Sequence, residues 1–308
     1  MAATAILLMA YGTPASADDI EPYLADIRRG CKPTPDAVED LKRRYLRIGG
    51  KSPLLEITRA QASAVEKQLN SQGVSTRVYI GMKHWHPYIR EVVPEIVADG
   101  YDRIVGLVLA PHYSQMSIGG YERALREAAD TAGGLNTDFV QSWYDHPLFH
   151  RAVKEKIEKA LPQFVEPERV QLLFSAHSLP EPILATNDPY PQQLASSCSS
   201  VADLVGHRKW SFAYQSAGQT DGKWLRPDLI EYLRDLKPVD PLAGVLVVPI
   251  GFVADHLEIL YDIDKEAQEF AGSINLDLKR TESLNTSPTF ISALTDIVRK
   301  HLCPVPSG

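Results

Sequence analysis

The chain has 308 residues, of which 44% are hydrophobic and 23% are charged, a composition typical of a soluble globular protein. Its formal net charge is −7 and it contains no long basic run, so we expect no nucleic-acid partner. The three cysteines, Cys31, Cys198 and Cys303, form no CxxC pair, which argues against a zinc knuckle or an iron–sulfur cluster and favours a reducing, cytoplasmic setting.

The first apolar stretch, 2–10, is too short to span a membrane and lacks a basic start, so it predicts a buried strand and not a signal peptide. Further along the chain, short apolar segments alternate with longer amphipathic ones. Strands are expected at 5–10, 76–81, 103–110, 139–143, 170–176, 210–215 and 244–250. Helices are expected near 36–48, 57–69, 87–99, 120–130, 147–160, 190–205, 227–236 and 288–301. This alternation is typical of an α/β fold with parallel sheets.

The two halves of the chain resemble each other. Segment 7–14 (LLMAYGTP) parallels segment 173–180 (LFSAHSLP), since each is a strand that ends in a polar ring, a small turn and a proline. Segments 103–114 and 244–255 correspond in the same way. We therefore predict two similar doubly wound, Rossmann-like lobes with parallel sheets and an interlobe cleft. The expected boundaries are 1–150 for the N-terminal lobe and 151–287 for the C-terminal lobe, with a final helix at 288–308 joining the first lobe.

A segment near the C-terminal end carries a row of carboxylates. Asp255, Glu258, Asp262 and Glu266 follow the strand at 244–250 with spacings of three, four and four, which would place them on one face of a helix. A solvated acidic face is the commoner explanation of such a row. At the carboxyl end of a strand, the row is also a candidate cation site or proton path.

Ligands of open α/β sheets bind outside the carboxyl ends of the strands. His177 and Glu258 both follow apolar strands of the second half, so we expect both to face the same site. A neutral imidazole and a carboxylate together suit a borderline divalent cation. The alternatives are a hydrogen-bonded turn residue for His177 and a helix N-terminal acid for Glu258. The sequence has no GxGxxG turn after a strand, no P-loop and no GxSxG elbow.

Seven motifs, in order along nearly the whole chain, resemble the ferrochelatase family, and most closely its coproporphyrin-using members from Gram-positive-type bacteria. They are MAYGTP (9–14), IRRG (27–30), IGGKSPL (48–54), GMKH (81–84), LAPHYS (109–114), SAHSLP (175–180) and GFVADHLE (251–258). The resemblance implies insertion of Fe²⁺ into coproporphyrin III to give Fe-coproporphyrin III (coproheme) in haem biosynthesis. Tyr11 in its AYGTP context, and basic residues suited to four propionates, favour coproporphyrin.

The resemblance also implies roles for particular residues. His177 and Glu258 match the catalytic, metal-handling pair, and Tyr11 matches the axial ligand to product iron. Asp262 and Glu266 would continue the acidic path as a candidate outer metal site, although Lys265 places a cation beside them. The positions expected to bind the tetrapyrrole are Tyr11, Arg28, Arg44, Tyr45, Ser52, Lys83, His84 and Tyr121, with Trp224 as an apolar wall.

Two alternatives remain open from the sequence. One is a chelatase with another specificity, either for protoporphyrin IX or for another tetrapyrrole and metal. The other, from a different class, is a non-catalytic two-lobed binding protein. We expect the porphyrin and Fe²⁺ as substrates, no organic cofactor, no iron–sulfur cluster, transient contacts with other haem-pathway enzymes, and a monomer.

Overall fold

The computed structural model of the chain describes residues 3–207, 209–218, 222–236 and 243–302. These residues form two compact units. The first unit contains the described residues up to Trp143 and those from Asn285 onward, and the second contains Tyr144–Leu284. The boundary that the sequence suggested, at 150, falls inside helix α6 (Pro147–Ala160). The chain divides just before this helix because α6 packs on α7 of the second unit.

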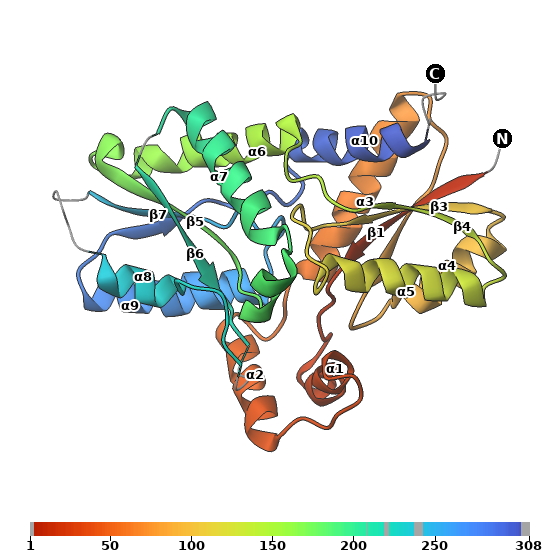
Figure 1. The fold of residues 1–308 in the computed structure, drawn as a ribbon, viewed down its shortest axis with the longest axis horizontal. Helices are drawn as coiled ribbons and strands as arrows, with labels where there is room; N and C mark the ends of the chain where they lie inside the picture. The colour runs from red at the N-terminus through yellow and green to blue at the C-terminus, as the bar shows by residue number, and fades with distance from the viewer. Residues whose placement is uncertain (1–2, 208, 219–221, 237–242, 303–308) are drawn as a thin grey trace. The chain divides into compact units, whose positions relative to one another are not determined.

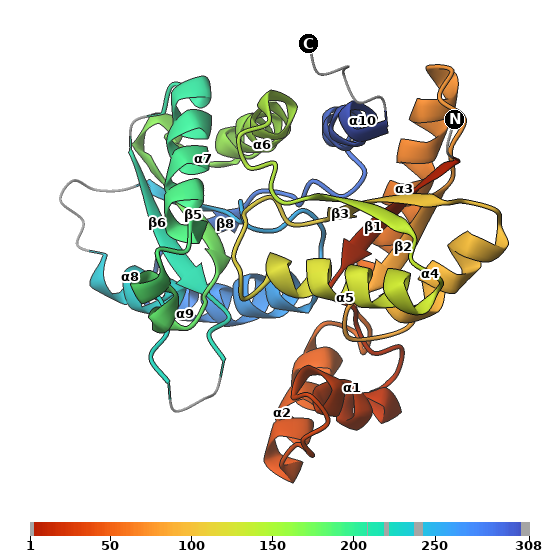
Figure 2. The same ribbon diagram turned by 45° about the vertical axis from the view of Figure 1, so that its right-hand side comes forward.

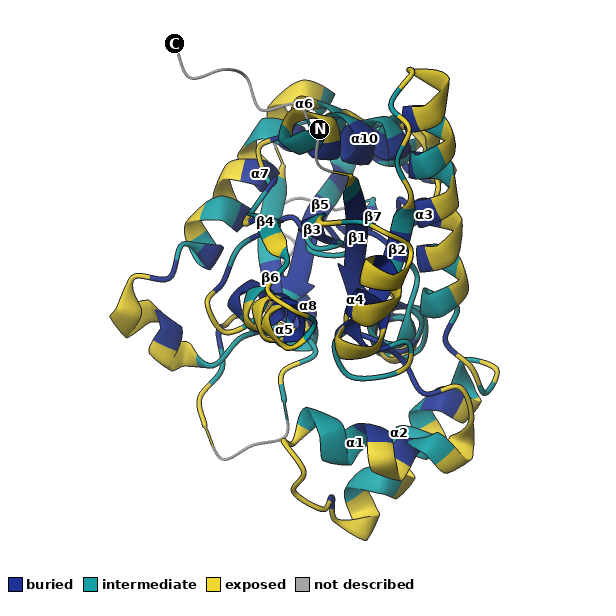
Figure 3. Ribbon diagram, turned by 90° about the vertical axis from the view of Figure 1, so that its right-hand side faces the viewer, coloured by how far each residue is buried: buried dark blue, intermediate teal, exposed yellow. Residues whose placement is uncertain are grey.

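The first unit is built on a parallel sheet with the strand order β2-β1-β3-β4. Its strands are β1 (Thr4–Ala10), β2 (Val78–Met82), β3 (Arg103–Val108) and β4 (Asn136–Val140). Helices cover both faces, with α4 and α5 on one and α3 and α10 on the other (Figure 1). The central strands are therefore almost wholly buried (Figure 3), which explains their continuous apolar sequences.

Each of the five helices predicted in the first unit begins within three residues of its predicted start. Thr34 caps one of them, since its Oγ1 accepts a hydrogen bond from Ala37 N at 3.3 Å, and a proline follows at the first helical position. After a short turn, η1 (Ala17–Asp19), the helices are α1 (Ile20–Ile27), α2 (Pro35–Arg47), α3 (Leu54–Ser71), α4 (Ile89–Ala98), α5 (Ile118–Thr131) and α10 (Pro288–Leu302). The first two pack on each other, apart from the sheet (Figure 2).

The second unit repeats this architecture. Its parallel sheet has the order β6-β5-β7-β8, so the first strand again lies between the second and the third. The strands are β5 (Val170–His177), β6 (Trp210–Gln215), β7 (Gly244–Val248) and β8 (Leu278–Arg280). The corresponding motifs of the two halves lie on equivalent strands, β1 with β5 and β3 with β7. The prediction of an α/β fold with two similar lobes is confirmed.

The helices of the second unit include one long π-helix, η5 (Glu258–Ala267), which continues into α9 (Gln268–Ser273). Ile259 and Ile263 of this helix pack against β7 in the core. The other helices are α6, α7 (Tyr190–Val205) and α8 (Leu229–Asp235), with short turns η2 (Leu161–Gln163), η3 (Pro167–Arg169) and η4 (Glu181–Thr186).

Three expectations differ from the structure. The acidic helix begins at Glu258 and is a π-helix, so Asp255 lies in the preceding loop and does not share a helix face with the other carboxylates. The strand expected at 139–143 runs from Asn136 to Val140. Strand β8 was not expected, because its three residues carry little apolar signal. Residues 303–308 of the predicted final helix, with Cys303, lie outside the described residues.

Candidate active site

His177 and Glu258 lie side by side in the second unit. His177 is the last residue of β5 and Glu258 is the first residue of η5. The imidazole Nε2 lies 3.5 Å from the carboxylate Oε1, and about one third of each side chain is exposed (35% and 32%). Two side chains that are 81 positions apart in the sequence thus form one polar pair that solvent and ligands can reach.

The backbone around His177 fixes how its ring is presented. Nδ1 donates a hydrogen bond to the carbonyl oxygen of Ser178, and the Tyr190 hydroxyl donates to the carbonyl oxygen of His177 at 2.9 Å. In a neutral imidazole this arrangement places the proton on Nδ1 and leaves the Nε2 lone pair directed at the Glu258 side. The Trp224 ring lies 6.5 Å from the imidazole, between centroids, as a nearby apolar surface.

A second histidine, His256, faces the same carboxylate. Its Nε2 lies 3.6 Å from Glu258 Oε2, and its Nδ1 donates to the carbonyl oxygen of Ala254 at 2.9 Å. Glu258 therefore lies between two imidazoles, each tied to the backbone through Nδ1. His256 was not among the predicted site residues, although it stands in the same motif two residues before Glu258.

The ion pair shifts the titration of both partners. Burial alone would lower the pKa of His177, but attraction and hydrogen bonding by Glu258 outweigh it and raise that pKa to about 9. Burial likewise opposes ionisation of Glu258, yet His177 and His256 hold its pKa far below its usual range. Without a metal ion, the pair is an imidazolium and a carboxylate at neutral pH. An ion that binds Nε2 must therefore displace a proton.

Among the described residues, no three or more His, Cys, Asp or Glu side chains are arranged as a closed metal site. A cation held by His177 and Glu258 would keep several coordination positions for water or substrate. Open positions are what a site that passes its ion onward requires, whereas a structural site closes the shell with protein ligands.

The remaining carboxylates of the acidic row have different surroundings. Asp262, in η5 with Glu258, is buried and accepts a hydrogen bond from the Ser216 hydroxyl. Glu266 is exposed. Asp255 is held by a neighbouring strand, since Arg280 Nη2 lies 3.2 Å from its Oδ1 and the Ser283 hydroxyl donates to it at 2.7 Å.

Arg280 also binds Asp264 through two contacts of 2.6 and 2.8 Å. Because Asp255 and Asp264 share the half-buried guanidinium of Arg280, their two negative charges are partly compensated within the fold. The expectation of four equivalent carboxylates on one helix face was therefore wrong. The acidic row that remains consists of Glu258, the buried Asp262 and the exposed Glu266.

In the first unit, candidate residues gather after β1 and β2. Tyr11 is 42% exposed, and its ring lies 4.6 Å from that of His84, between centroids. His84 Nδ1 is 2.8 Å from the carboxylate of Asp26. Lys83 Nζ lies 4.9 Å from the centre of the Tyr121 ring. These four candidates thus lie near one another at the carboxyl edge of the first sheet.

The charge around Lys83 is positive. Burial and, to a smaller extent, repulsion from Arg123 and Arg29 together lower the pKa of its amine to about 8. An ammonium held beside two guanidinium groups is stabilised by an anionic partner. The carboxylate of a substrate is one such partner.

The other candidates of the first unit have local structural contacts. Arg44 Nε binds Asp40 at 2.8 Å on α2, and Arg28 is exposed at the end of α1. Tyr45 is buried and its hydroxyl lies 2.8 Å from Thr13 Oγ1. The buried Ser52 accepts a hydrogen bond from Leu54 N at 3.3 Å, at the start of α3. Tyr45 and Ser52 therefore support the fold whether or not they also contact a ligand.

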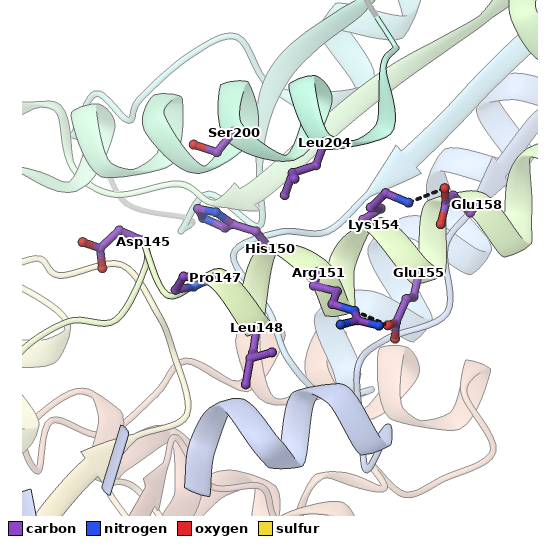
Figure 4. Close-up of a pocket in the computed structure, with 10 residues that line it drawn as sticks. All are labelled: Asp145, Pro147, Leu148, His150, Arg151, Lys154, Glu155, Glu158, Ser200 and Leu204. Carbon is purple, nitrogen blue, oxygen red and sulfur yellow. Dashed lines mark hydrogen bonds and ion pairs between the residues drawn. The ribbon is translucent and has the colours of Figure 1, made fainter. Parts of the chain in front are cut away.

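A groove of about 820 Å³ lies elsewhere in the second unit, along α6 and the end of α7 (Figure 4). Its charged side chains are largely paired along α6, as Arg151 with Glu155 and Lys154 with Glu158. Neither His177 nor Glu258 lines it. Solvated pairs spaced four residues apart are ordinary helix-surface contacts, so this groove is not the candidate active site.

Residues 3–302 match the sequence profile of a protein family described as Ferrochelatase. The chain belongs to the ferrochelatase family. A ferrochelatase of Herpetosiphon aurantiacus is 43% identical to it over 301 residues, which cover 96% of this chain and 98% of that protein. The coproporphyrin III ferrochelatase of Bacillus subtilis is 42% identical over 301 residues, covering 96% of this chain and 97% of that protein.

Solved chelatase structures share the fold of this ferrochelatase. The sirohydrochlorin chelatase SirB from Bacillus subtilis, in complex with cobalt, matches with a TM-score of 0.59 at 11% identity, covering 97% of this chain and 94% of that one. CbiX matches with a TM-score of 0.54 at 11% identity, covering 97% and 100%. In the part of this ferrochelatase that the structure describes, no helix is long and apolar enough to cross a membrane.

Proposed function

We propose that this ferrochelatase inserts Fe²⁺ into coproporphyrin III and releases Fe-coproporphyrin III, a step of haem biosynthesis. Family membership supports metal insertion into a porphyrin, and relatives at 42–43% identity named coproporphyrin III ferrochelatase support the choice of porphyrin. The observation that carries the proposal is the pairing of His177 and Glu258 at 3.5 Å, in an open setting that suits transfer of a cation.

In this mechanism the ion first replaces the proton on His177. Fe²⁺ binds Nε2 and the Glu258 carboxylate, which neutralises the carboxylate and releases one proton to solvent. The hydrogen bond from Nδ1 to the Ser178 carbonyl keeps Nε2 in position during this exchange. Water ligands are lost as the carboxylate and the porphyrin nitrogens replace them.

The second stage passes the ion into the ring. When Fe²⁺ leaves Nε2 for the pyrrole nitrogens, His177 recovers its high basicity beside Glu258 and accepts one of the two pyrrole protons. The other proton leaves through Glu258 and His256 or through water. Counted over both stages, one Fe²⁺ enters the porphyrin and two protons are released, and His177 ends as it began.

The residues of the first unit are proposed to bind the porphyrin. Lys83, within its cluster of cations, would bind a propionate, and the exposed Tyr11 would lie against the iron as an axial ligand. The further proposed contacts are Arg28, Arg44, Tyr45, Ser52, His84 and Tyr121, with Trp224 of the second unit as an apolar wall.

An anaerobic assay with the purified protein, porphyrin and metal salt tests the proposal. Coproporphyrin III and protoporphyrin IX are compared with Fe²⁺, Co²⁺ and Zn²⁺, and metal insertion is followed by absorbance. We expect the highest kcat/KM with coproporphyrin III and Fe²⁺, without an organic cofactor or an iron–sulfur cluster. Faster turnover of protoporphyrin IX would favour the alternative substrate, and the absence of insertion with every pair would refute the chelatase function.

We further propose that the enzyme is a cytoplasmic monomer with transient contacts to other haem-pathway enzymes. Cys31 and Cys198 are free thiols, which suits a reducing compartment. Size-exclusion chromatography with light scattering, at several protein concentrations, tests the oligomeric state. A mass near 34.1 kDa at all concentrations is expected for a monomer.

A further inference from the structure

Gln215 ends β6 directly beside the candidate active site. In the parallel ladder of the second sheet it is the register partner of His177. Its backbone carbonyl accepts a hydrogen bond from Ser178 N at 2.7 Å, which ties the residue after His177 to β6. Its side chain is 1% exposed, so the polar groups of the carboxamide must be satisfied within the protein.

The carboxamide joins two elements that meet at the site. Gln215 Nε2 donates a hydrogen bond to the carbonyl oxygen of Glu258 at 3.1 Å. Gln215 Oε1 accepts one from the Ser175 hydroxyl at 2.8 Å, and Ser175 stands on β5 two residues before His177. One buried side chain therefore links the strand that carries His177 to the first residue of the π-helix that carries Glu258.

This link matters because the two proposed metal ligands come from different elements. His177 is placed by the β5 ladder, whereas Glu258 follows a loop of nine residues after β7 and opens η5. The same loop is tied to β5 at one further point, where Gly251 N donates to the Ser175 carbonyl at 3.1 Å. Between that point and the helix, Arg280 and Ser283 hold Asp255, and the Gln215 contact holds the backbone carbonyl of Glu258.

We propose that Gln215 is a positioning residue that fixes the distance between His177 Nε2 and the Glu258 carboxylate. The Gln215 side chain would not contact the metal or the porphyrin. It would hold the backbone of Glu258 against β5, so that the imidazole and the carboxylate present a preformed pair to the incoming ion. The catalytic part of this inference rests on the proposed function, but the metal-binding part does not.

Two substitutions at Gln215 distinguish a positioning role from a general contribution to the stability of the fold. Gln215→Met keeps the length of the side chain and removes both hydrogen bonds. Gln215→Glu keeps an acceptor for the Ser175 hydroxyl and, when ionised, removes the donor to Glu258. Ser197→Ala is the matched control, because it removes another buried hydrogen bond of the second unit, from Ser197 Oγ to the Tyr144 carbonyl at 2.9 Å.

The experiment measures five quantities for each variant, namely the unfolding temperature, porphyrin affinity, Zn²⁺ affinity by calorimetry without porphyrin, kcat, and KM for the metal. Removing a side chain that orients a metal ligand costs about 10–100-fold in metal affinity or activity. We expect such a loss in Zn²⁺ affinity and in kcat/KM for the metal in both Gln215 variants. Porphyrin affinity should stay within about twofold of wild type, and Ser197→Ala should change only the unfolding temperature.

Several results would overturn the inference. Zn²⁺ affinity and metal KM equal to those of Ser197→Ala would show that Gln215 is merely structural. If Gln215→Met does not fold, Gln215→Glu decides the question by the same measurements. A wild-type protein that binds Zn²⁺ but inserts no metal would refute the proposed function and leave the calorimetric comparison decisive for Gln215. A wild type that neither binds nor inserts metal would refute both.

Discussion

The carboxyl ends of β1 and β5 are equivalent positions in two sheets of the same strand order, and they carry opposite chemistry. After β1 and β2, the Tyr11 ring lies against the His84 ring at a tilt of 55°, and a cationic group lies at Lys83. After β5, His177 faces the carboxylate of Glu258. The same scaffold thus presents an aromatic and cationic edge in the first unit and an imidazole–carboxylate edge in the second.

The pKa values of Lys83 and His177 reflect this difference between the two units. In the first unit, burial and neighbouring guanidinium groups lower the pKa of Lys83 to about 8. In the second, burial opposes the charge on His177, but neighbouring carboxylates raise its pKa to about 9. A positive field suits propionate carboxylates and a negative field suits a metal cation. We therefore propose that the first unit anchors the porphyrin and the second handles the ion.

His177→Ala tests the proposal that the second unit handles the ion, and it should have the largest effect on turnover. Removing the nitrogen ligand and proton acceptor is expected to lower kcat by on the order of 10²–10⁴-fold. Porphyrin affinity, measured by fluorescence quenching, should change little. His207→Ala is the control, since His207 Nε2 also binds a backbone carbonyl, that of Val170, at 2.7 Å. Normal turnover by His177→Ala would remove His177 from the mechanism.

Lys83→Met tests the proposal that the first unit anchors the porphyrin. A lost charge-assisted hydrogen bond to a propionate is worth about 1.5–3 kcal/mol, so coproporphyrin affinity should fall about 10–100-fold. The KM for the metal at saturating porphyrin should stay the same. Lys67→Met, at an exposed position on α3, should alter neither quantity. A variant at Lys83 that weakens metal binding and spares porphyrin binding would reverse the proposed assignment of the two units.

The fold and the central pair could be predicted because their signals are local. Buried parallel strands read as continuous apolar runs, as at 104–110, and the first residues after such strands lie at the ligand-binding edge of a sheet. That rule alone places His177 and Tyr11 at the edges of their sheets. Glu258 follows the apolar strand at 244–250, so the same reasoning pairs it with His177, and the family motifs then imply the metal-handling role of the pair.

What the sequence did not predict depends on contacts between distant segments. Asp255 appeared to belong to an acidic helix because its spacing fits an α-helical period, but Arg280, on a strand too short and polar to be recognised, holds it in the preceding loop. Gln215 looked like any residue at the end of a strand. Its role appears only when the partners of its buried carboxamide, on β5 and η5, are known.

A smaller effect is expected along the π-helix. Asp262→Asn keeps a side-chain oxygen for the Ser216 hydroxyl and removes a negative charge near His177 and Glu258. Losing about 1 kcal/mol of attraction would raise the metal KM about fivefold. Glu266→Gln is the matched control on the exposed end of the row, with an expected change under about twofold. Equal effects at Asp262 and Glu266 would instead support a continuous acidic path.

The smallest expected effect is the change of porphyrin affinity with pH. It is also the most direct test of the charge on Lys83 in the first unit. Lys83 has a lowered pKa, so its ammonium is present below about pH 8 and is lost as the pH rises through that value. A bound propionate favours the ammonium, and coproporphyrin affinity should therefore fall about twofold between pH 7 and pH 8. The Lys83→Met variant should bind coproporphyrin weakly, and its affinity should not fall with pH in this way.

His177→Ala is the control. Because His177 lies in the second unit, which is proposed to handle the ion, this variant should keep the wild-type dependence of porphyrin affinity on pH. A profile that becomes flat in His177→Ala and persists in Lys83→Met would mean that the group controlling porphyrin affinity belongs to the second unit.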